Sequence, residues 1–288
     1  MKGRKLSRRE SLVGLGFAMG SILGIGVFFL APFCVTIYYS LTASMAGEYV
    51  GLRNYAQMLQ NGAFQLAALN TGRFIGTAVP LIMTVGLGVA LLLYRGLKGS
   101  AFFRTVFIFP LVLPVASVVL IFQVVFSGNG ALNTLWESLG IPIVDWLNSP
   151  QAFTVLVLLY IWKNVGYNII LFLAALRSIP AELYEAATID GAGGWQKLRR
   201  ITLPLIVPYL FFIFVISIIN CFKAFREAYI LCLEHPHKSI YMLQHFMNNN
   251  FSNLNYIRLS TASILVFVII FILVYILLKL RGRTQVQL

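Results

Sequence analysis

Long runs of apolar residues, separated by shorter polar segments, follow one another along the chain. A helix needs about 20 apolar residues to cross about 30 Å of hydrocarbon, so the runs predict six membrane-spanning helices. The predicted spans are about 12–39, 73–94, 105–126, 152–175, 203–222 and 260–280. The runs are continuous and do not alternate residue by residue, which favours helices over the strands of a membrane β-barrel.

The composition agrees with this pattern. Of the 288 residues, 59% are hydrophobic and 11% are charged. A soluble domain of this length needs more polar surface than that. With short connections between the spans, we expect residues 1–288 to form a single all-α transmembrane domain that contacts membrane lipid.

The net charge of +13 could indicate nucleic-acid binding, but the positions of the Lys and Arg residues along the chain indicate membrane topology instead. Most of the Lys and Arg residues lie in the connections and tails on one side of the predicted membrane: Lys2, Arg4, Lys5, Arg8, Arg9, Arg95, Lys98, Arg104, Arg177, Lys197, Arg199, Arg200, Lys279, Arg281 and Arg283. By the positive-inside rule, both termini and the connection between the fourth and fifth spans are cytoplasmic. We therefore expect no nucleic-acid partner.

That connection contains an unusual segment, ELYEAATIDGAGGWQKLRRITLP at 182–204. Pro180 suits a helix start, so residues 181–190 predict a short helix. Gly191, Gly193 and Gly194 can end it, because glycine adopts the left-handed conformation that a reversal needs. A slim helix–turn–helix of this kind can dock into another protein or lie on lipid headgroups, and the residues alone leave both readings open.

Polar residues inside a span are costly and mark functional positions. In the fourth span, Tyr160, Lys163, Asn164 and Tyr167 follow the i, i+3, i+4, i+7 spacing of one helix face, and Asn168 lies beside them. Aromatic rings and amides suit a sugar, but they could also form hydrogen bonds between helices. For Lys163, pairing with a backbone carbonyl or a neighbouring helix is an equal alternative.

Catalytic and metal chemistry find little support. The predicted spans place no acid well inside the membrane and hold no Ser/His/Asp arrangement. His235, His237 and His245 with Glu234 could suggest a metal site, yet they lack the spacing of known zinc motifs. We expect neither enzymatic activity nor a bound metal.

The segment at 182–204 resembles the EAA loop of permease subunits in binding-protein-dependent ABC importers. The resemblance rests on Glu185-Ala186-Ala187, Gly191, Ile201 and Leu203-Pro204 at fixed spacing. It extends along the chain in GLRNYAQML (51–59), FFRTVFIFPLVLP (102–114), ALNTLWESLG (131–140), DWL (145–147) and LAALRSIP (173–180). These segments resemble the carbohydrate-uptake branch, of the glycerol-phosphate/multiple-sugar type of first permease.

The resemblance implies a bacterial or archaeal plasma-membrane subunit. Its EAA loop would be the coupling helix, with Glu185, Ala186, Ala187, Asp190 and Gly191 at the ATPase contact. The implied partners are a second, different permease, a cytoplasmic ATPase dimer and an extracytoplasmic sugar-binding protein. ATP and Mg would bind the ATPase, and no cofactor is expected in this chain.

The resemblance also extends the expected substrate pathway. Tyr160, Lys163, Asn164 and Tyr167 fall at positions where a sugar-importing member contacts its sugar, as do Asn220, Cys221 and Ala224 of the next span. Cys221 and Ala224 replace asparagines of that member. Glu234-His235-Pro236 stands where the family often has a Gly-Gly-Pro turn, so the contact of that turn with the binding protein is in question.

The function expected from the sequence is that of the pathway subunit of an ATP-driven carbohydrate importer. The alternatives are an ABC permease for a non-sugar solute such as glycerol phosphate, and a stand-alone transporter driven by an ion gradient.

Overall fold

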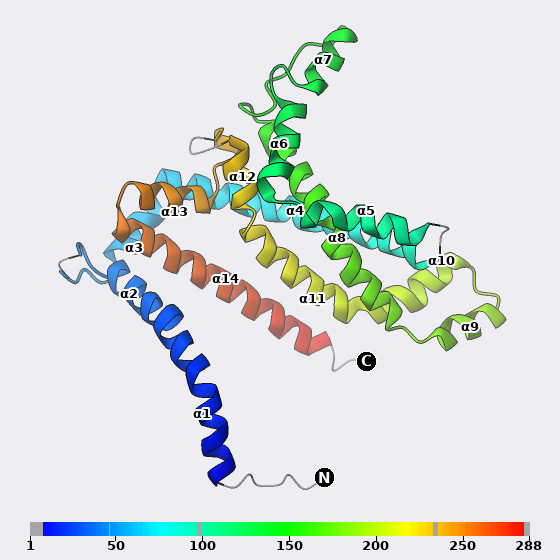
Figure 1. The fold of residues 1–288 in the computed structure, drawn as a ribbon, viewed down its shortest axis with the longest axis horizontal. Helices are drawn as coiled ribbons and strands as arrows, with labels where there is room; N and C mark the ends of the chain where they lie inside the picture. Colours follow the sequence, from blue (N-terminus) through cyan, green and yellow to red (C-terminus); the bar gives the residue numbers. More distant parts are fainter. Residues whose placement is uncertain (1–7, 46, 97–98, 233–235, 285–288) are drawn as a thin grey trace. The chain divides into compact units, whose positions relative to one another are not determined.

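The computed structural model describes residues 8–45, 47–96, 99–232 and 236–284 (Figure 1), and their regular elements are helices beside one isolated β-bridge, Thr42 to Tyr49. The α-helices are α1 (Arg8–Ile25), α2 (Ala31–Ser40), α3 (Arg53–Gln60), α4 (Gly62–Tyr94), α5 (Ser100–Val112), α6 (Val115–Phe126), α7 (Ala131–Ser138), α8 (Ala152–Arg177), α9 (Ala181–Ile189), α10 (Gly194–Lys197), α11 (Leu203–Phe222), α12 (Phe225–Cys232), α13 (Leu243–Ser252) and α14 (Tyr256–Thr284). Two π-helices, η1 (Gly26–Leu30) and η2 (Leu198–Thr202), and one 3₁₀-helix, η3 (Lys238–Ile240), complete the set.

The predicted all-α class and number of spans are confirmed for the described part of the chain. Six of its helical segments are long and apolar enough to cross a membrane: Ala18–Ser40, Gly62–Tyr94, Val115–Ser138, Ala152–Arg177, Gly194–Cys232 and Tyr256–Lys279. The predicted fifth span, 203–222, has the same bounds as α11. The second starts earlier than expected, because α4 begins at Gly62.

The third predicted span, 105–126, is not one continuous helix. It divides into α5 and α6 at Leu113 and Pro114, whose ψ angles of 142° and 139° are extended. Proline lacks the amide hydrogen that would continue the helix and disfavours helical geometry in the residue before it. The break therefore follows from Pro114.

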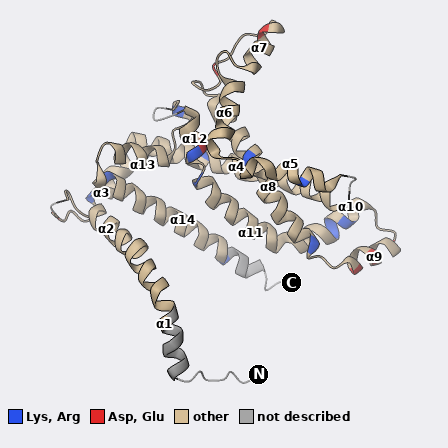
Figure 2. Cartoon of the chain, viewed as in Figure 1, with Lys and Arg blue, Asp and Glu red and all other residues tan. Residues whose placement is uncertain are grey.

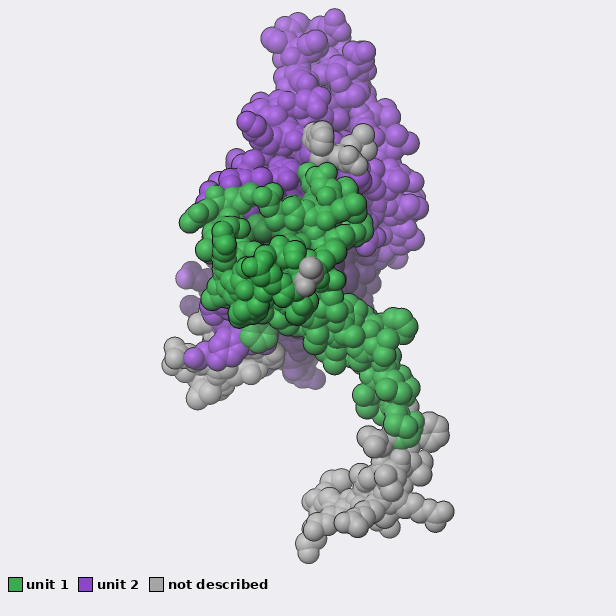
Figure 3. All heavy atoms as spheres, turned by 90° about the vertical axis from the view of Figure 1, so that its left-hand side faces the viewer, with its two compact units in different colours: residues 1–61, 247–271 green, residues 62–246, 272–288 purple. Residues whose placement is uncertain are grey.

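The chain forms two compact units, residues 1–61 with 247–271 and residues 62–246 with 272–288 (Figure 3). The prediction of a single domain over 1–288 stays a prediction. In the first unit, Asn54 Nδ2 donates to the carbonyl oxygens of Ser40 (3.0 Å) and Thr42 (2.8 Å), which holds α3 to the end of α2. The rings of Phe33 and Phe267 join α2 to α14.

In the second unit, α8 is the central helix. Of its most apolar stretch 61% is buried, against 28% or less for the other candidate spans. It runs beside α4 and α11 (Figure 1), and the fully buried side chains of Phe74, Leu159 and Phe172 lie in this core.

Two glycines allow the helices of this unit to approach closely. A Cβ on Gly166 of α8 would lie 2.2 Å from the carbonyl oxygen of Phe107 in α5. A Cβ on Gly86 of α4 would lie 3.0 Å from the Cβ of Asn168. Small residues at such contacts are the usual means of close helix packing in membranes.

Between α6 and α8 the chain is organised around the buried Asn133. Its Nδ2 donates to the carbonyl oxygens of Gly128 (3.0 Å) and Val144 (2.8 Å), and its Oδ1 accepts from Val144 N–H (3.2 Å) and Trp146 Nε1–H (3.1 Å). The segments ALNTLWESLG and DWL, both part of the family resemblance, therefore meet at one amide.

The histidines considered for a metal site have separate roles. His245 is fully buried between aromatic rings, where burial lowers its pKa to about 4, and its Nδ1 accepts from Met242 N–H at 3.2 Å. His237 caps η3 by accepting from Ser239 N–H. Glu234 and His235 lie outside the described residues, and so does their part of the altered turn. Among the residues described, no group of three metal-ligating side chains could hold an ion.

Candidate functional site

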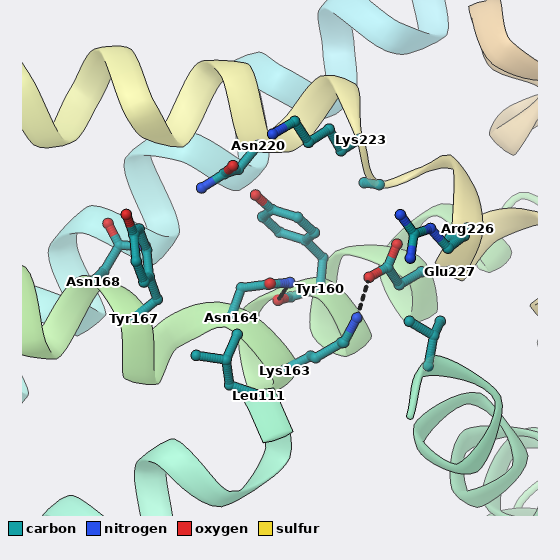
Figure 4. Close-up of a pocket in the computed structure, with 12 residues that line it drawn as sticks. Leu111, Tyr160, Lys163, Asn164, Tyr167, Asn168, Asn220, Lys223, Arg226 and Glu227 are labelled. Atoms are coloured by element: carbon teal, nitrogen blue, oxygen red, sulfur yellow. Dashed lines mark hydrogen bonds and ion pairs between the residues drawn. The ribbon is translucent and has the colours of Figure 1, made fainter. Parts of the chain in front are cut away.

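A cavity of about 380 Å³ opens within the second unit, between α5, α6, α8, α11 and α12 (Figure 4). Leu111 and Val115, on either side of the break in the third predicted span, form one wall. The other lining side chains are polar or charged apart from Ala224. We call it the polar cavity.

The fourth predicted span supplies the largest share of the lining. Tyr160, Lys163, Asn164 and Tyr167 all line the polar cavity, as the shared helix face predicts. Asn164 Nδ2 donates to the Tyr160 carbonyl at 2.9 Å, within the same helix. The ring of Tyr160 packs edge-on against Phe74 at 5.3 Å, which holds the phenol at the cavity wall.

Asn168 has a structural contact as well as a place in the lining. Ser217 Oγ of α11 donates to its Oδ1 at 3.0 Å, and the asparagine is 3% exposed. The sequence left two roles open for the Tyr and Asn residues of this face, binding a sugar or forming hydrogen bonds between helices. Among these residues, the described structure has an interhelical hydrogen bond at Asn168.

On α11 and the turn after it, Asn220 and Ala224 line the polar cavity. Cys221 is buried, at 3% exposure, and is not among the lining residues. The structure therefore brings the sequence-predicted pathway residues together with the exception of Cys221.

Lys163 forms a buried ion pair with Glu227. Its Nζ lies 2.6 Å from Glu227 Oε1, and the two side chains are 10% and 7% exposed. Pairing with a neighbouring helix, one of the alternatives for Lys163, is therefore present, while its side chain also lines the polar cavity. A buried lysine without a partner would be far more costly than this pair.

The expectation that no acid lies well inside a membrane span is wrong for Glu227, which lies in α12 within a candidate span. The prediction ended the fifth span at 222, whereas helical structure resumes at Phe225 and the candidate span runs to Cys232. A signal was present in the sequence. Asn220, Lys223, Ala224 and Glu227 repeat the i, i+3, i+4, i+7 spacing, and all four line the polar cavity.

The predicted EAA loop forms an exposed helix–turn–helix over residues 181–202, here called the elbow. Helix α9 starts after Pro180 and ends where Gly191 has a φ of +73°. Gly191 N–H donates to Thr188 O (3.1 Å) and Ala192 N–H to Ala187 O (2.8 Å), the two bonds of a Schellman cap. Glu185, Ala186 and Asp190 are exposed, and Ala187 is half-buried.

Two side-chain hydrogen bonds join α9 to the second half of the elbow, which leads into α11. Tyr184 Oη and Thr202 Oγ1 lie 2.9 Å apart, and Lys197 Nζ donates to Thr188 Oγ1 at 2.7 Å. Thr202 directly precedes α11, which carries Asn220. At the surface, Ile189 is 88% and Trp195 71% exposed. Large exposed apolar side chains of this kind mark contact surfaces.

The family follows from comparison with known proteins. A model described as "Binding-protein-dependent transport system inner membrane component" matches residues 82–283. The chain belongs to this family. It is therefore a multi-pass inner-membrane component of a transport system and not an enzyme, and the resemblance to ABC importer permeases is confirmed. The stand-alone, ion-driven alternative is wrong, because the systems of this family depend on a separate binding protein.

Relatives extend the likeness over most of the chain. It is 30% identical to the trehalose/maltose transport system permease protein MalF of Thermococcus litoralis, with 92% of each chain covered. It is 34% identical to the arabinooligosaccharides transport system permease protein AraP of Bacillus subtilis, with 75% of this chain and 70% of AraP covered. A chain of a bacterial alginate ABC transporter, crystallised with an alginate pentasaccharide-bound periplasmic protein, matches with a TM-score of 0.86 at 22% identity, covering 96% of each. This last likeness shows a shared fold.

Proposed function

We propose that this chain forms part of the membrane pathway of an ATP-driven importer that moves a mono- or oligosaccharide into the cytoplasm by alternating access. The observation that carries the proposal is the polar cavity, whose two tyrosines and two of whose three asparagines come from a single face of α8. A sugar ring has an apolar face for the tyrosines and a rim of hydroxyls for the amides. The names of the related permeases MalF and AraP support a sugar as cargo.

The elbow is the proposed contact with a cytoplasmic ATPase dimer, which binds ATP and Mg. Its exposed Ile189 and Trp195 favour docking, and the hydrogen bond between Tyr184 and Thr202, the residue before α11, provides a path toward the polar cavity. ATP would shift the permease between inward- and outward-facing states only if the ATPase binds the elbow differently in the two. A second permease and an extracytoplasmic sugar-binding protein complete the proposed assembly.

The same proposal places both termini and the elbow in the cytoplasm. Within the second unit, the basic residues after α4 and before α11 lie together, since Arg95 and Lys197 line one small cavity with Tyr94 and Tyr184. Figure 2 shows ribbon segments coloured for Lys and Arg near α10. This clustering is what the positive-inside rule expects of a cytoplasmic end.

The direct test is to purify the chain gently from its native membrane, identify the proteins that accompany it, and reconstitute them in liposomes. We expect an ATPase, a second permease and a binding protein, and ATP-dependent uptake of a saccharide. Recovery of the chain alone, or uptake that ignores ATP, would contradict the proposal.

Replacing Gly191 with valine tests the coupling role of the elbow. Left-handed backbone costs a non-glycine residue about 1–2 kcal/mol, more for a β-branched one. A Cβ at Gly191 meets nothing within 4 Å, so the effect acts through the backbone alone. We expect ATP-driven uptake to fall by about tenfold or more, with the complex still assembled.

The matched control is Gly193→Val, two residues away. Gly193 has a φ of −69°, which any residue adopts, and its Cβ also meets nothing within 4 Å. Near-normal uptake in this variant, with loss in Gly191→Val, assigns the effect to the left-handed turn. Equal uptake and ATPase stimulation in the two variants would remove the turn from coupling.

Replacing Tyr167 with alanine tests the cargo contact. An aromatic contact worth about 1.4 kcal/mol corresponds to one decade of affinity, so we expect uptake to fall about tenfold. Tyr167 is a cleaner probe than Asn168, whose removal also breaks the bond to Ser217. Leu158→Ala on the same helix, at an exposed position away from the polar cavity, is the control. Unchanged uptake in Tyr167→Ala would take this side chain out of the pathway.

A further inference from the structure

The charges of the polar cavity do not balance. Lys163, Lys223 and Arg226 line it, and Glu227 is the one acid among the lining residues described. Glu227 is already committed to Lys163 at 2.6 Å. Lys223 and Arg226 are exposed, and no hydrogen bond or ion pair joins either to another described side chain.

The two free cations lie at membrane depth. Lys163 is eleven residues into α8, about 17 Å from its first residue at 1.5 Å per residue. Glu227, bonded to Lys163, lies at the same depth, and Arg226 and Lys223 are within about one helical turn of it along the chain. Positive charge at this depth requires a negative partner or water. Of the acids whose side chains are described, Glu227 alone lines the cavity, so a negative partner for these cations would come from another molecule.

The geometry points to one ligand for both cations. Lys223 directly follows α11 and Arg226 is the second residue of α12, so the two cations lie on either side of the short turn between these helices and line the same cavity. Arginine binds such groups with two parallel hydrogen bonds, and lysine supplies a point charge. Figure 4 shows Lys223 on the same side of the polar cavity as Asn220, with Arg226 beside Glu227.

Hydroxyl-binding groups surround the same space. Tyr160, Asn164 and Asn220 can exchange hydrogen bonds with hydroxyls. A ligand that carries both hydroxyls and an anionic group therefore offers partners to these side chains and to Lys223 and Arg226.

We propose that the cargo of this permease is an acidic carbohydrate, bearing a carboxylate or a phosphate that Lys223 and Arg226 bind. The inference rests on the proposed function and names the class of its substrate. A neutral sugar would leave both cations without a counter-charge, so the polar cavity discriminates against it. An acid on the second permease is the competing partner for the cations, and the test separates the two.

The experiment uses the complete complex with its binding protein in liposomes. The probes are a neutral trisaccharide, maltotriose; a carboxylated one, trigalacturonate; and two phosphate esters, glucose 6-phosphate and glycerol 3-phosphate. We expect ATP-dependent uptake of trigalacturonate or glucose 6-phosphate at ten times the maltotriose rate or more. A preference for trigalacturonate assigns a carboxylate ligand, and a preference for glucose 6-phosphate assigns a phosphate; glycerol 3-phosphate is the anionic probe that is not a carbohydrate.

Variants then assign the effect to the two cations. Lys223→Gln with Arg226→Gln is expected to lower uptake of the anionic probe at least tenfold, and Lys223→Arg with Arg226→Lys to retain most of it. The conservative pair controls for assembly, and the wild-type probe comparison stands without any variant.

Several outcomes overturn the inference. Uptake of maltotriose in preference to every anionic probe would do so and leave the proposed function intact. Wild-type uptake of the anionic probe by the double glutamine variant would assign the cations to the second permease. ATP-dependent uptake of a non-carbohydrate alone, or of no probe, would overturn the proposed function as well.

Discussion

Glu227→Ala is expected to reduce the amount of folded complex in the membrane severely. Removing one partner of a buried ion pair leaves an uncompensated charge and costs about 3–5 kcal/mol. Here the orphan would be Lys163, which is 10% exposed as a side chain and lies in the middle of α8. We expect the thermal stability of the purified complex and its yield to fall together.

The companion variant separates stability from transport. Lys163→Met combined with Glu227→Leu replaces the pair by apolar side chains, which in buried pairs is often neutral or stabilising. Assembly should therefore return in the double variant. If uptake remains absent in it, the pair also serves the pathway. Wild-type stability in Glu227→Ala alone would contradict the buried pair itself.

The second large effect is expected at Gly166. A methyl group there meets the Phe107 carbonyl oxygen at 2.2 Å and the Ile108 Cα at 3.0 Å, so α5 must move away from α8. Backbone atoms cannot rotate aside as a side chain can. Overpacking of this kind costs about 1–3 kcal/mol, occasionally more. We expect Gly166→Ala to lose stability and uptake, because the displaced wall also lines the polar cavity through Leu111.

Gly88→Ala on α4 is the control for this prediction. It adds the same methyl group to a membrane helix, but nothing lies within 4 Å of that position. Its thermal stability should match the wild type or exceed it slightly, since alanine favours a helix over glycine. Equal melting temperatures for Gly166→Ala and Gly88→Ala would show that α5 and α8 are not in close contact.

Much of the architecture could be predicted from the sequence because a membrane imposes simple rules. Continuous apolar length identified the spans, and the 3.6-residue period placed Tyr160 and Tyr167 on one face. The three glycines of the elbow predicted its turn, and Gly191 has the left-handed φ that the turn needs. Each of these features is local in the chain.

The features that the sequence did not predict depend on contacts between distant segments. From the sequence, an acid such as Glu227 is expected outside the membrane. Its burial depends on the ion pair with Lys163, which lies 64 positions earlier in the chain. Cys221 shares the helical segment of Asn220 but is turned into the core, which the spacing of one helix cannot decide. A proline such as Pro114 weakens a helix locally, yet whether it hinges the helix or divides it depends on the helices around it.

Asn133 has a consequence for the order of the segment between α6 and α8. This segment is held by the hydrogen bonds of one buried amide, with the rings of Trp136 and Trp146 5.0 Å apart beside it. Elements that share one anchor open together, as a cooperative unit of local unfolding. Since the hydrogen bonds of Asn133 tie both ends of the segment together, we expect protection of its backbone amides from hydrogen exchange to rise or fall for the whole segment at once.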